Sequence, residues 1–404
     1  MVEIFRRRVS SAIGLFMAWS VPSGVALADQ EAPALYDARS AGMGGTGYSF
    51  CDSGAAPFFN PANMDLWEKT AVTLAVTPTF GRVSAPFAGP GTETDSTRGF
   101  APFFLVGGGY RVQKRLVIGL SAYVTGGVGS SYRDVEAVGG EDLDLSVGLG
   151  EVSLPISVRI LDNLSFGVAF RVALAFQNSD AIDPTSGERI QQSQRGVGVP
   201  GFLVGINYRP IQKLRLSLTY KSRVDIDLSG DTTLPGDVTV HSDSQLFLPH
   251  SLQVESAVSL LQDALLLAVA LNYQFYDQSH NTVTTTLDVP PDGAEQTVIL
   301  NWRNTITGKI GAEYRISKLV SVRAGYIVGN SAVPKSEANP FLPTPGVLQA
   351  VTAGVGFDVG DFEISTALIF SFAKTDVTEM PANGTPGVYK SNSVGFALSG
   401  TFRR

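Results

Sequence analysis

The chain has 404 residues, of which 44% are hydrophobic and 17% charged, and its formal net charge at pH 7 is −7. This acidic balance argues against nucleic acid as a partner. The only cysteine, Cys51, excludes an intramolecular disulfide, and three scattered histidines give no metal-ligand cluster, so we expect no metal and no other cofactor.

Residues 1–28 have the pattern of a secretory signal peptide. Three arginines at positions 6–8 precede an apolar run from Val9 to Val25, and Ala26-Leu27-Ala28 is a small-x-small cleavage site. The run is too short and too interrupted to predict a spanning helix. The alternative is an uncleaved N-terminal anchor. We expect export of the mature chain to the outer membrane of a Gram-negative bacterium.

Residues 29–67 are typical of neither a strand nor a helix. The glycine-rich stretch SAGMGGTG (40–47) allows tight, irregular packing. Further on, Phe58 and Phe59 lead into Asn60, Pro61 and Ala62, and Asn-Pro is a turn dipeptide. Ahead of a large barrel, a compact segment of this kind fills a lumen that otherwise forms an aqueous channel. We predict a hatch over 29–67 with these five residues packed inside the barrel; a periplasmic extension is the alternative.

Residues 68–404 predict an all-β fold, a transmembrane antiparallel β-barrel of about 14 strands. In 164–177 and 214–228, apolar residues alternate with small or polar ones, as a lipid-facing strand requires. A soluble sandwich also alternates, but strands of about ten residues and their aromatic ends favour a membrane. The expected strands begin near residues 69, 101, 115, 150, 163, 197, 213, 249, 264, 301, 318, 347, 361 and 392.

Short polar turns such as RVQKR (111–115) and RISK (315–318) alternate with longer polar segments. This alternation is typical of the two ends of an outer-membrane barrel. The longer segments, which we expect to be loops, are 84–99, 130–149, 178–196, 229–247, 277–298, 329–346 and 374–391.

Three stretches resemble the FadL-type family of outer-membrane transporters for long-chain fatty acids and other hydrophobic compounds. The first, SAGMGGTGYSFCDSGAAPFFNPANM (40–64), is similar to the family's hatch with its Asn-Pro-Ala element. The others, at 198–231 and 301–326, resemble barrel hairpins. The resemblance implies a plugged barrel with a lateral gap at a kink in the third strand. Here Gly126 and Gly127 are the candidate kink residues, although "TGG" replaces the family's frequent aromatic beside the kink glycine.

The resemblance also implies the function and the partners. We expect passive uptake of hydrophobic molecules, most of all long-chain fatty acids, through ligand binding in the lumen and hatch rearrangement. The alternatives are an aromatic-hydrocarbon channel of the same family, a general porin, and a structural or adhesive barrel. Other expected partners are outer-membrane lipid, lipopolysaccharide and the barrel-insertion machinery, and we expect a monomer. The chain ends in TFRR, so the C-terminal aromatic Phe402 is slightly internal.

Cations on the lumen face are candidates for binding a ligand carboxylate. Alternation places eight of them inside the barrel: Arg159, Arg171, Arg215, Lys221, Arg223, Arg303, Lys309 and Arg323. Most are expected to pair with Glu255, Glu313, Glu363, Asp225 or Asp227. Arg171 and Lys309 have small neighbours and no evident acid partner on adjacent strands, so we select them. We expect no enzyme, because the three histidines cannot complete a nucleophile–base pair.

Overall fold

The computed structural model describes residues 36–182, 188–277, 282–289, 293–382 and 384–404. The predicted signal peptide and hatch residues 29–35 lie outside the described residues. The helical elements are α3 (Ala38–Gly42), α4 (Ala56–Phe59), η2 (Pro61–Leu66), η3 (Glu136–Val138) and η4 (Lys335–Glu337). Among the described residues, we find no helix with the length and hydrophobicity needed to cross a bilayer.

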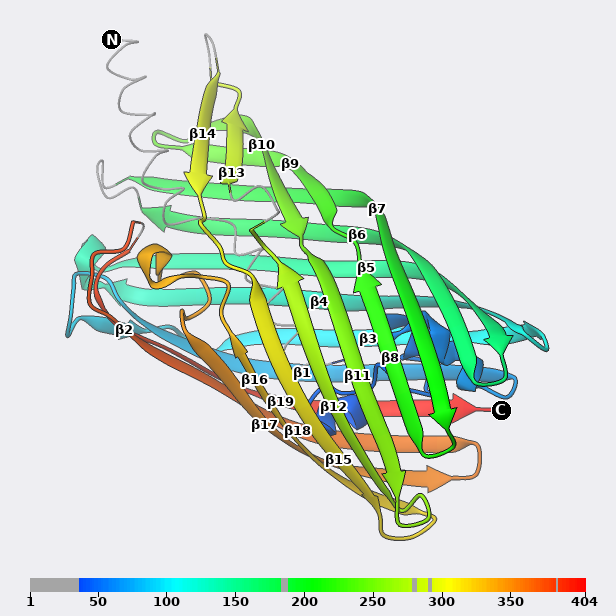
Figure 1. The fold of residues 1–404 in the computed structure, drawn as a ribbon. Helices are drawn as coiled ribbons and strands as arrows, with labels where there is room; N and C mark the ends of the chain where they lie inside the picture. Colours follow the sequence, from blue (N-terminus) through cyan, green and yellow to red (C-terminus); the bar gives the residue numbers. More distant parts are fainter. Residues whose placement is uncertain (1–35, 183–187, 278–281, 290–292, 383) are drawn as a thin grey trace.

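All the remaining elements of the described chain are strands of one sheet (Figure 1). They are β1 (Thr70–Pro86), β2 (Glu93–Asp95), β3 (Gly99–Gln113), β4 (Leu116–Val135), β5 (Glu141–Leu161), β6 (Leu164–Ile182), β7 (Arg189–Ile211), β8 (Leu214–Lys221), β9 (Val224–Leu234), β10 (Val238–Leu248), β11 (His250–Leu260), β12 (Leu265–Phe275), β13 (Thr282–Leu287), β14 (Ala294–Ile299), β15 (Thr305–Arg315), β16 (Val320–Asn330), β17 (Val347–Val359), β18 (Phe362–Val377) and β19 (Gly387–Arg403).

The sheet closes on itself because β1 pairs with β19 on one side and with β3 on the other. Over the described residues, five wall positions are shared by two consecutive strands each: β2 with β3, β8 with β9, β10 with β11, β12 with β13, and β14 with β15. For example, β7 pairs with β8 near one end of the barrel and with β9 near the other. The predicted antiparallel barrel of 14 strands is therefore confirmed.

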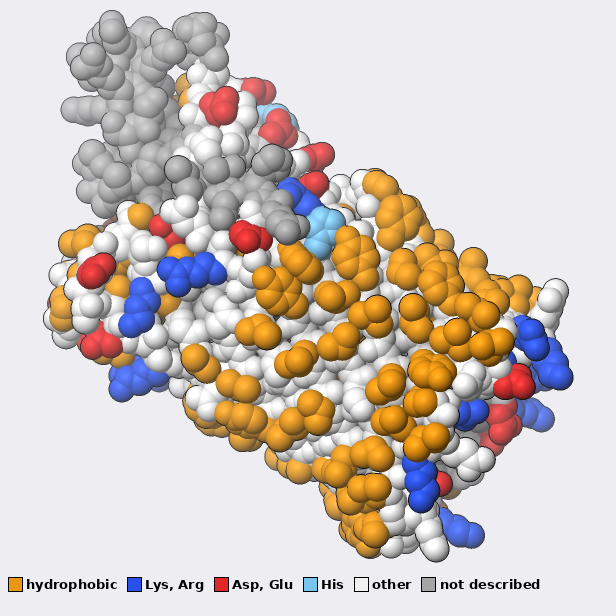
Figure 2. Space-filling view, viewed as in Figure 1, with side chains coloured by type: hydrophobic (Ala, Val, Ile, Leu, Met, Phe, Trp, Pro, Cys, Tyr) orange, Lys and Arg blue, Asp and Glu red, His pale blue; other side chains and the backbone are white. Residues whose placement is uncertain are grey.

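Side-chain alternation explains why the wall is stable in a bilayer. Along β6, Val168, Phe170 and Leu174 point outward and are exposed, whereas Ala169 and Ala173 face inward and are buried. Apolar side chains cover a broad band of the outer surface, and charged side chains lie beyond both edges of the band (Figure 2). Lipid contacts favour this arrangement, and closure of the sheet pairs its first long strand with its last.

Several predicted loops are wrong in their boundaries, because the strands extend much further. β5 begins at Glu141 and β7 at Arg189, and β9 and β10 form a hairpin within the predicted loop 229–247. These extensions continue past the apolar band, where no lipid contact requires alternating apolar residues. Their polar sequence therefore resembles a loop although the backbone remains paired.

The described part of the hatch, residues 36–67, lies inside the barrel at the end that carries the C-terminus, where Figure 1 draws it in dark blue. Of these residues, only Arg39, Asp52 and Leu66 are not fully buried. The hatch contacts strands on several sides, including β5, β6 and β17. It therefore fills the lumen cross-section at this end.

Candidate functional site

Asn60 is the central connection between the hatch and the wall. It precedes η2, and its side-chain oxygen accepts a hydrogen bond from the Ala62 backbone N–H at 2.9 Å. Its amide nitrogen donates to the carbonyls of Tyr48 and Ile206, both at 3.0 Å. Pro61 follows at the first position of the helix, where its missing N–H costs nothing. One side chain thus caps a helix, joins two parts of the hatch and contacts β7.

Two wall glycines allow this close approach. A Cβ at Gly205 would overlap the Asn60 side chain, and a Cβ at Gly167 would overlap the backbone of Pro61 and Ala62. The hatch turn therefore packs directly on the backbone of β6 and β7.

The two phenylalanines lie in a buried aromatic cluster. Phe58 packs against Tyr36, with 4.1 Å between ring centroids, and edge-on against Tyr123 of β4 at 4.8 Å. Phe59 contacts Phe58 and Tyr48 at 4.9 and 5.3 Å. This packing is the structural reason why large aromatic residues stand beside a turn.

Charged groups hold the other side of the hatch. Arg39 of α3 donates to both carboxylate oxygens of Glu313 on β15 and to Asp52. Glu255 of β11 accepts from the backbone N–H groups of Gly47 and Ser49, both at 2.8 Å. Both wall carboxylates are buried, and their hydrogen bonds to the hatch therefore stabilise its docked position.

The network continues from Asp52 to the last strand, where Arg403 donates to Asp52 and to Glu363, each at 2.6 Å. Burial alone would raise the pKa of the Asp52 carboxyl, but Arg39, Arg403 and Arg215 outweigh it and hold that pKa below its usual range. Beside it, burial raises the pKa of the Cys51 thiol. Cys51 is therefore an unreactive thiol while the hatch is docked.

The cations predicted on the lumen face have different partners in the structure. The prediction that Arg171 lacks an acid partner is wrong, because Glu151 on the neighbouring strand β5 binds it through both carboxylate oxygens, at 2.6 and 2.8 Å. The sequence places Glu151 near the expected strand start at 150, whereas β5 begins nine residues earlier, at Glu141, so Glu151 lies well inside a paired strand. Lys309 is buried, with its Nζ 5.3 Å from the Tyr48 ring centroid.

Of the other candidates, Arg323 pairs with Glu313 and Glu363 as predicted. Arg223 and Arg303, in contrast, lie outside the strands and so are not placed by alternation. Arg223 pairs with Asp225, its expected partner.

The pairing of β3 with β4 is interrupted. It runs from Gln113↔Leu116 to Leu105↔Tyr123 and stops there. Beyond this point β4 pairs only with β5, with a register shift between Val124 and Gly126. The next backbone bond across the gap runs from the Thr97 N–H to the Ser131 carbonyl, at 2.7 Å. We call this gap, between β3 residues 99–104 and β4 residues 124–130, the wall opening.

The register shift has the form of a β-bulge, in which one extra residue, Thr125, is left without a partner on β5. It includes the first of the two candidate kink glycines, Gly126. Such a bulge turns a strand away from its neighbour, which explains why β4 leaves β3 here.

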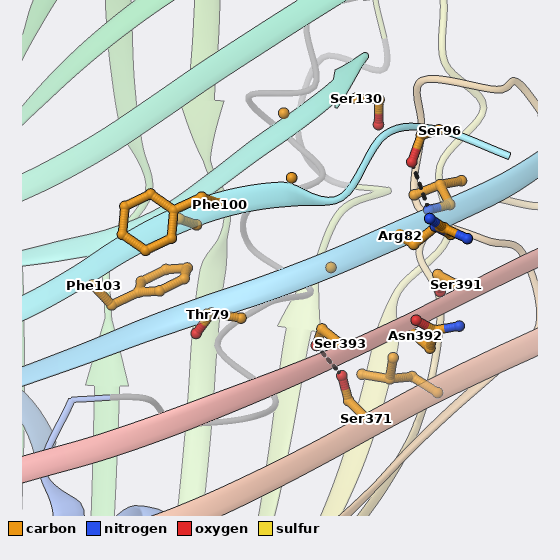
Figure 3. Close-up of a pocket in the computed structure, with 16 residues that line it drawn as sticks. Thr79, Arg82, Ser96, Phe100, Phe103, Ser130, Ser371, Ser391, Asn392 and Ser393 are labelled. Carbon is orange, nitrogen blue, oxygen red and sulfur yellow. Dashed lines mark hydrogen bonds between the residues drawn. The ribbon is translucent and has the colours of Figure 1, made fainter. Parts of the chain in front are cut away.

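Two cavities adjoin the wall opening. The wall cavity, of about 1020 Å³, is lined by residues of β3 to β7, among them Phe104, Val124 and Gly148. The lumen cavity, of about 170 Å³, is lined by apolar residues such as Phe100 and Phe103 together with hydroxyl and amide side chains such as Thr79, Ser371 and Asn392 (Figure 3). Phe100, Ala101, Phe103 and Gly129 line both cavities, so the two meet at the opening.

A cluster of apolar side chains extends to this opening from the end of the barrel with the long connections. This cluster of buried side chains includes Tyr132, Trp302 and Phe341 and extends to Val147 and Leu149. The last two also line the wall cavity. Buried apolar side chains therefore extend from the upper lumen to the opening. Apolar surroundings of this kind suit a hydrophobic ligand and not a hydrated ion.

A closed 14-stranded barrel with an apolar outer band and an internal plug defines an outer-membrane channel protein. The model of the family described as "Outer membrane protein transport protein (OMPP1/FadL/TodX)" matches residues 16–391. The chain belongs to this family, as its resemblance predicted. No curated protein sequence matches it significantly.

Solved structures share the fold at low identity. A Pseudomonas aeruginosa FadL homologue has a TM-score of 0.76 and 17% identity over 91% of this chain and 98% of its own. The Pseudomonas putida toluene transporter TodX has a TM-score of 0.71 and 15% identity, with the same coverage. The Ralstonia pickettii toluene transporter TbuX has a TM-score of 0.71 and 17% identity, again with the same coverage.

Proposed function

We propose that this chain is a passive uptake channel for hydrophobic molecules, most of all long-chain fatty acids, in a Gram-negative outer membrane. Ligand enters at the end with the long connections, binds to the apolar lumen surface, and leaves sideways between β3 and β4. The observation that carries the proposal is the wall opening, where paired strands separate and cavities meet from both sides. Family membership supports transport.

The hatch gives this route its direction. The described hatch residues fill the lumen at the C-terminal end, so a ligand that moves along the barrel axis meets the hatch. The sideways route instead follows apolar side chains and the wall cavity into the lipid. Rearrangement of the hatch upon ligand binding is part of the proposal, with Phe58, Phe59 and the Asn60-Pro61-Ala62 turn as its moving contacts.

A fatty-acid carboxylate in the lumen needs a cation. Of the two residues selected from the sequence, we propose Lys309, because it is buried in the lumen beside the hatch, whereas Arg171 forms a two-point ion pair with Glu151 of the wall. Lys309 also contacts Tyr48 of the hatch. Ligand binding at Lys309 would therefore act on the hatch directly.

The competing functions make different demands. A general porin needs an open lumen, which the buried hatch opposes. An adhesive barrel needs no opening in its wall. An aromatic-hydrocarbon channel would use the same route without a carboxylate contact, and TodX and TbuX are described as toluene transporters. We further propose a monomer, cleaved after residue 28, that meets lipid, lipopolysaccharide and the insertion machinery.

Uptake of a labelled C18 fatty acid by cells that lack their own fatty-acid channel tests the proposal. Cells with the wild-type chain should take it up, and deletion of Thr125 should reduce uptake strongly, because it removes the extra bulge residue and lets β4 pair regularly. Deletion of Gly360, in the exposed turn between β17 and β18, is the control. The proposal fails if wild-type cells show no uptake, or if both deletions give correctly assembled barrels with equal uptake.

A further inference from the structure

The wall cavity has an unusual distribution of charge. Its lining is largely apolar and includes the outward-facing Phe104, Leu174 and Phe176. Among the described residues that line it, Arg195 of β7 alone carries a charge. With a volume of about 1020 Å³, the cavity lies at the upper end of the range of about 300–1,000 Å³ that is usual for small-molecule sites. A chamber with one cation suits an amphipathic anion.

Arg195 lies at the border of the apolar band. It stands directly opposite Phe176 in the β6–β7 register, and both side chains are on the outer face. Toward the membrane centre the next outward residue of β7 is Val197, whereas in the other direction it is Ser193. On β6, the next outward residue beyond Phe176, away from the membrane centre, is Asn178, which also lines the cavity. An apolar chamber with a polar upper rim matches the two ends of a fatty acid.

The neighbouring acidic side chains are already engaged. Asp180 accepts hydrogen bonds from Arg189 and Gln191, and Asp227 accepts one from Gln245. In the part of the chain that the structure describes, the exposed guanidinium of Arg195 has neither a hydrogen bond nor an ion pair. Its donors are therefore available to a ligand, and no nearby carboxylate has to be displaced.

We propose that Arg195 binds the carboxylate of a long-chain fatty acid on the lipid-facing side of the wall opening, while the hydrocarbon chain lies in the wall cavity. This assignment rests on the proposed function and sharpens it to amphipathic acids. A planar guanidinium can donate two parallel hydrogen bonds to one carboxylate. Arg195 thereby retains the ligand at the membrane interface as it passes between lumen and lipid.

Quenching of a tryptophan tests the assignment. Full-length Phe104→Trp protein in phosphatidylcholine nanodiscs is titrated with a C18 fatty acid that is brominated on its hydrocarbon chain. The fluorescence of the protein that retains Phe104 is subtracted, so that only the new tryptophan is followed. Arg195→Gln should weaken binding about three- to tenfold, a range between an exposed ion pair and a buried charge-assisted hydrogen bond. Arg195→Lys should recover part of the affinity. A brominated hydrocarbon of equal length should bind both proteins equally.

The matched control is Arg209→Gln, an exposed arginine near the other end of the same strand and outside the wall cavity. It should leave fatty-acid binding unchanged. Equal affinities of wild type and Arg195→Gln for the acid would overturn the assignment. A second result would also overturn it. If phosphatidic acid binds in a way that requires Arg195, whereas the fatty acid binds equally with or without Arg195, then Arg195 contacts a lipid phosphate. Neither result decides the proposed function. That function is tested separately, by measuring fatty-acid uptake in cells that carry the wild-type channel.

Discussion

Arg39 and Glu313 form a two-point ion pair that joins α3 of the hatch to β15 of the wall, with Nε–Oε2 and Nη2–Oε1 distances of 2.9 and 2.8 Å. The two residues are 274 positions apart in sequence. Glu313 also accepts a hydrogen bond from Arg323 of β16. One wall carboxylate therefore pairs with a cation of the barrel and with a cation of the hatch. If the hatch moves, Glu313 loses Arg39 and keeps Arg323.

Removing this pair should loosen the hatch and leave the barrel intact. Arg39→Gln breaks a partly buried ion pair, but Glu313 keeps Arg323, so the loss of docking free energy should stay at or below about 3 kcal/mol. Maleimide should then label Cys51 faster, because this buried thiol becomes accessible only when the hatch moves. Arg82→Gln, which removes an exposed pair with Asp95, is the control. Equal labelling rates in both variants would contradict the prediction.

Acidification should weaken hatch docking. The pKa of Asp52 in the docked hatch lies below its ordinary value of 3.8. Its contribution to docking is therefore complete above that value and is lost as the pH falls through the lowered pKa. Conductance in planar bilayers should rise over this acidic window. Asp52→Asn should already conduct more at neutral pH and respond less to acid; an unchanged acid response would show that other groups control it.

Adding one methyl group to the wall should displace the hatch turn. Gly205→Ala places a Cβ against the Asn60 side chain, whereas Gly400→Ala places one where no atom lies within 4 Å. Overpacking of this kind costs about 1–3 kcal/mol. We expect faster Cys51 labelling and altered uptake for Gly205→Ala, with a correctly assembled barrel. If both alanine variants behave as wild type, the turn has room that the structure does not show.

Deleting residues 29–67 should leave an assembled barrel with a higher conductance. The barrel should assemble because its strands, from β1 to β19, pair with one another and not with the hatch. Its conductance should rise because the hatch fills the lumen. Heat-modifiable migration on gels checks assembly, and single-channel recording checks conductance. An assembled barrel with unchanged conductance would mean that the segment does not obstruct the lumen.

Much of this architecture follows from local pattern. Alternation along the strands requires only that one face meets lipid, so strands such as β6 and β8 were predictable one at a time. The hatch was predictable from a different signal, since the glycines and the Asn-Pro turn of 40–64 exclude regular pairing. Strand ends beyond the apolar band were not predictable, because no lipid face constrains their sequence there.

The sequence alone therefore determined a membrane barrel, its plug and its family resemblance, because each depends on residues close together in the chain. Tertiary structure decided which charges meet. Arg171 forms an ion pair with Glu151 on the neighbouring strand of the β5–β6 pair, and Arg39 of the hatch forms one with Glu313 of the wall. It also decided that Phe176 of β6 and Arg195 of β7 line one cavity with Phe104 of β3. Such juxtapositions depend on strand register and barrel closure, which relate residues far apart in sequence and leave no local pattern.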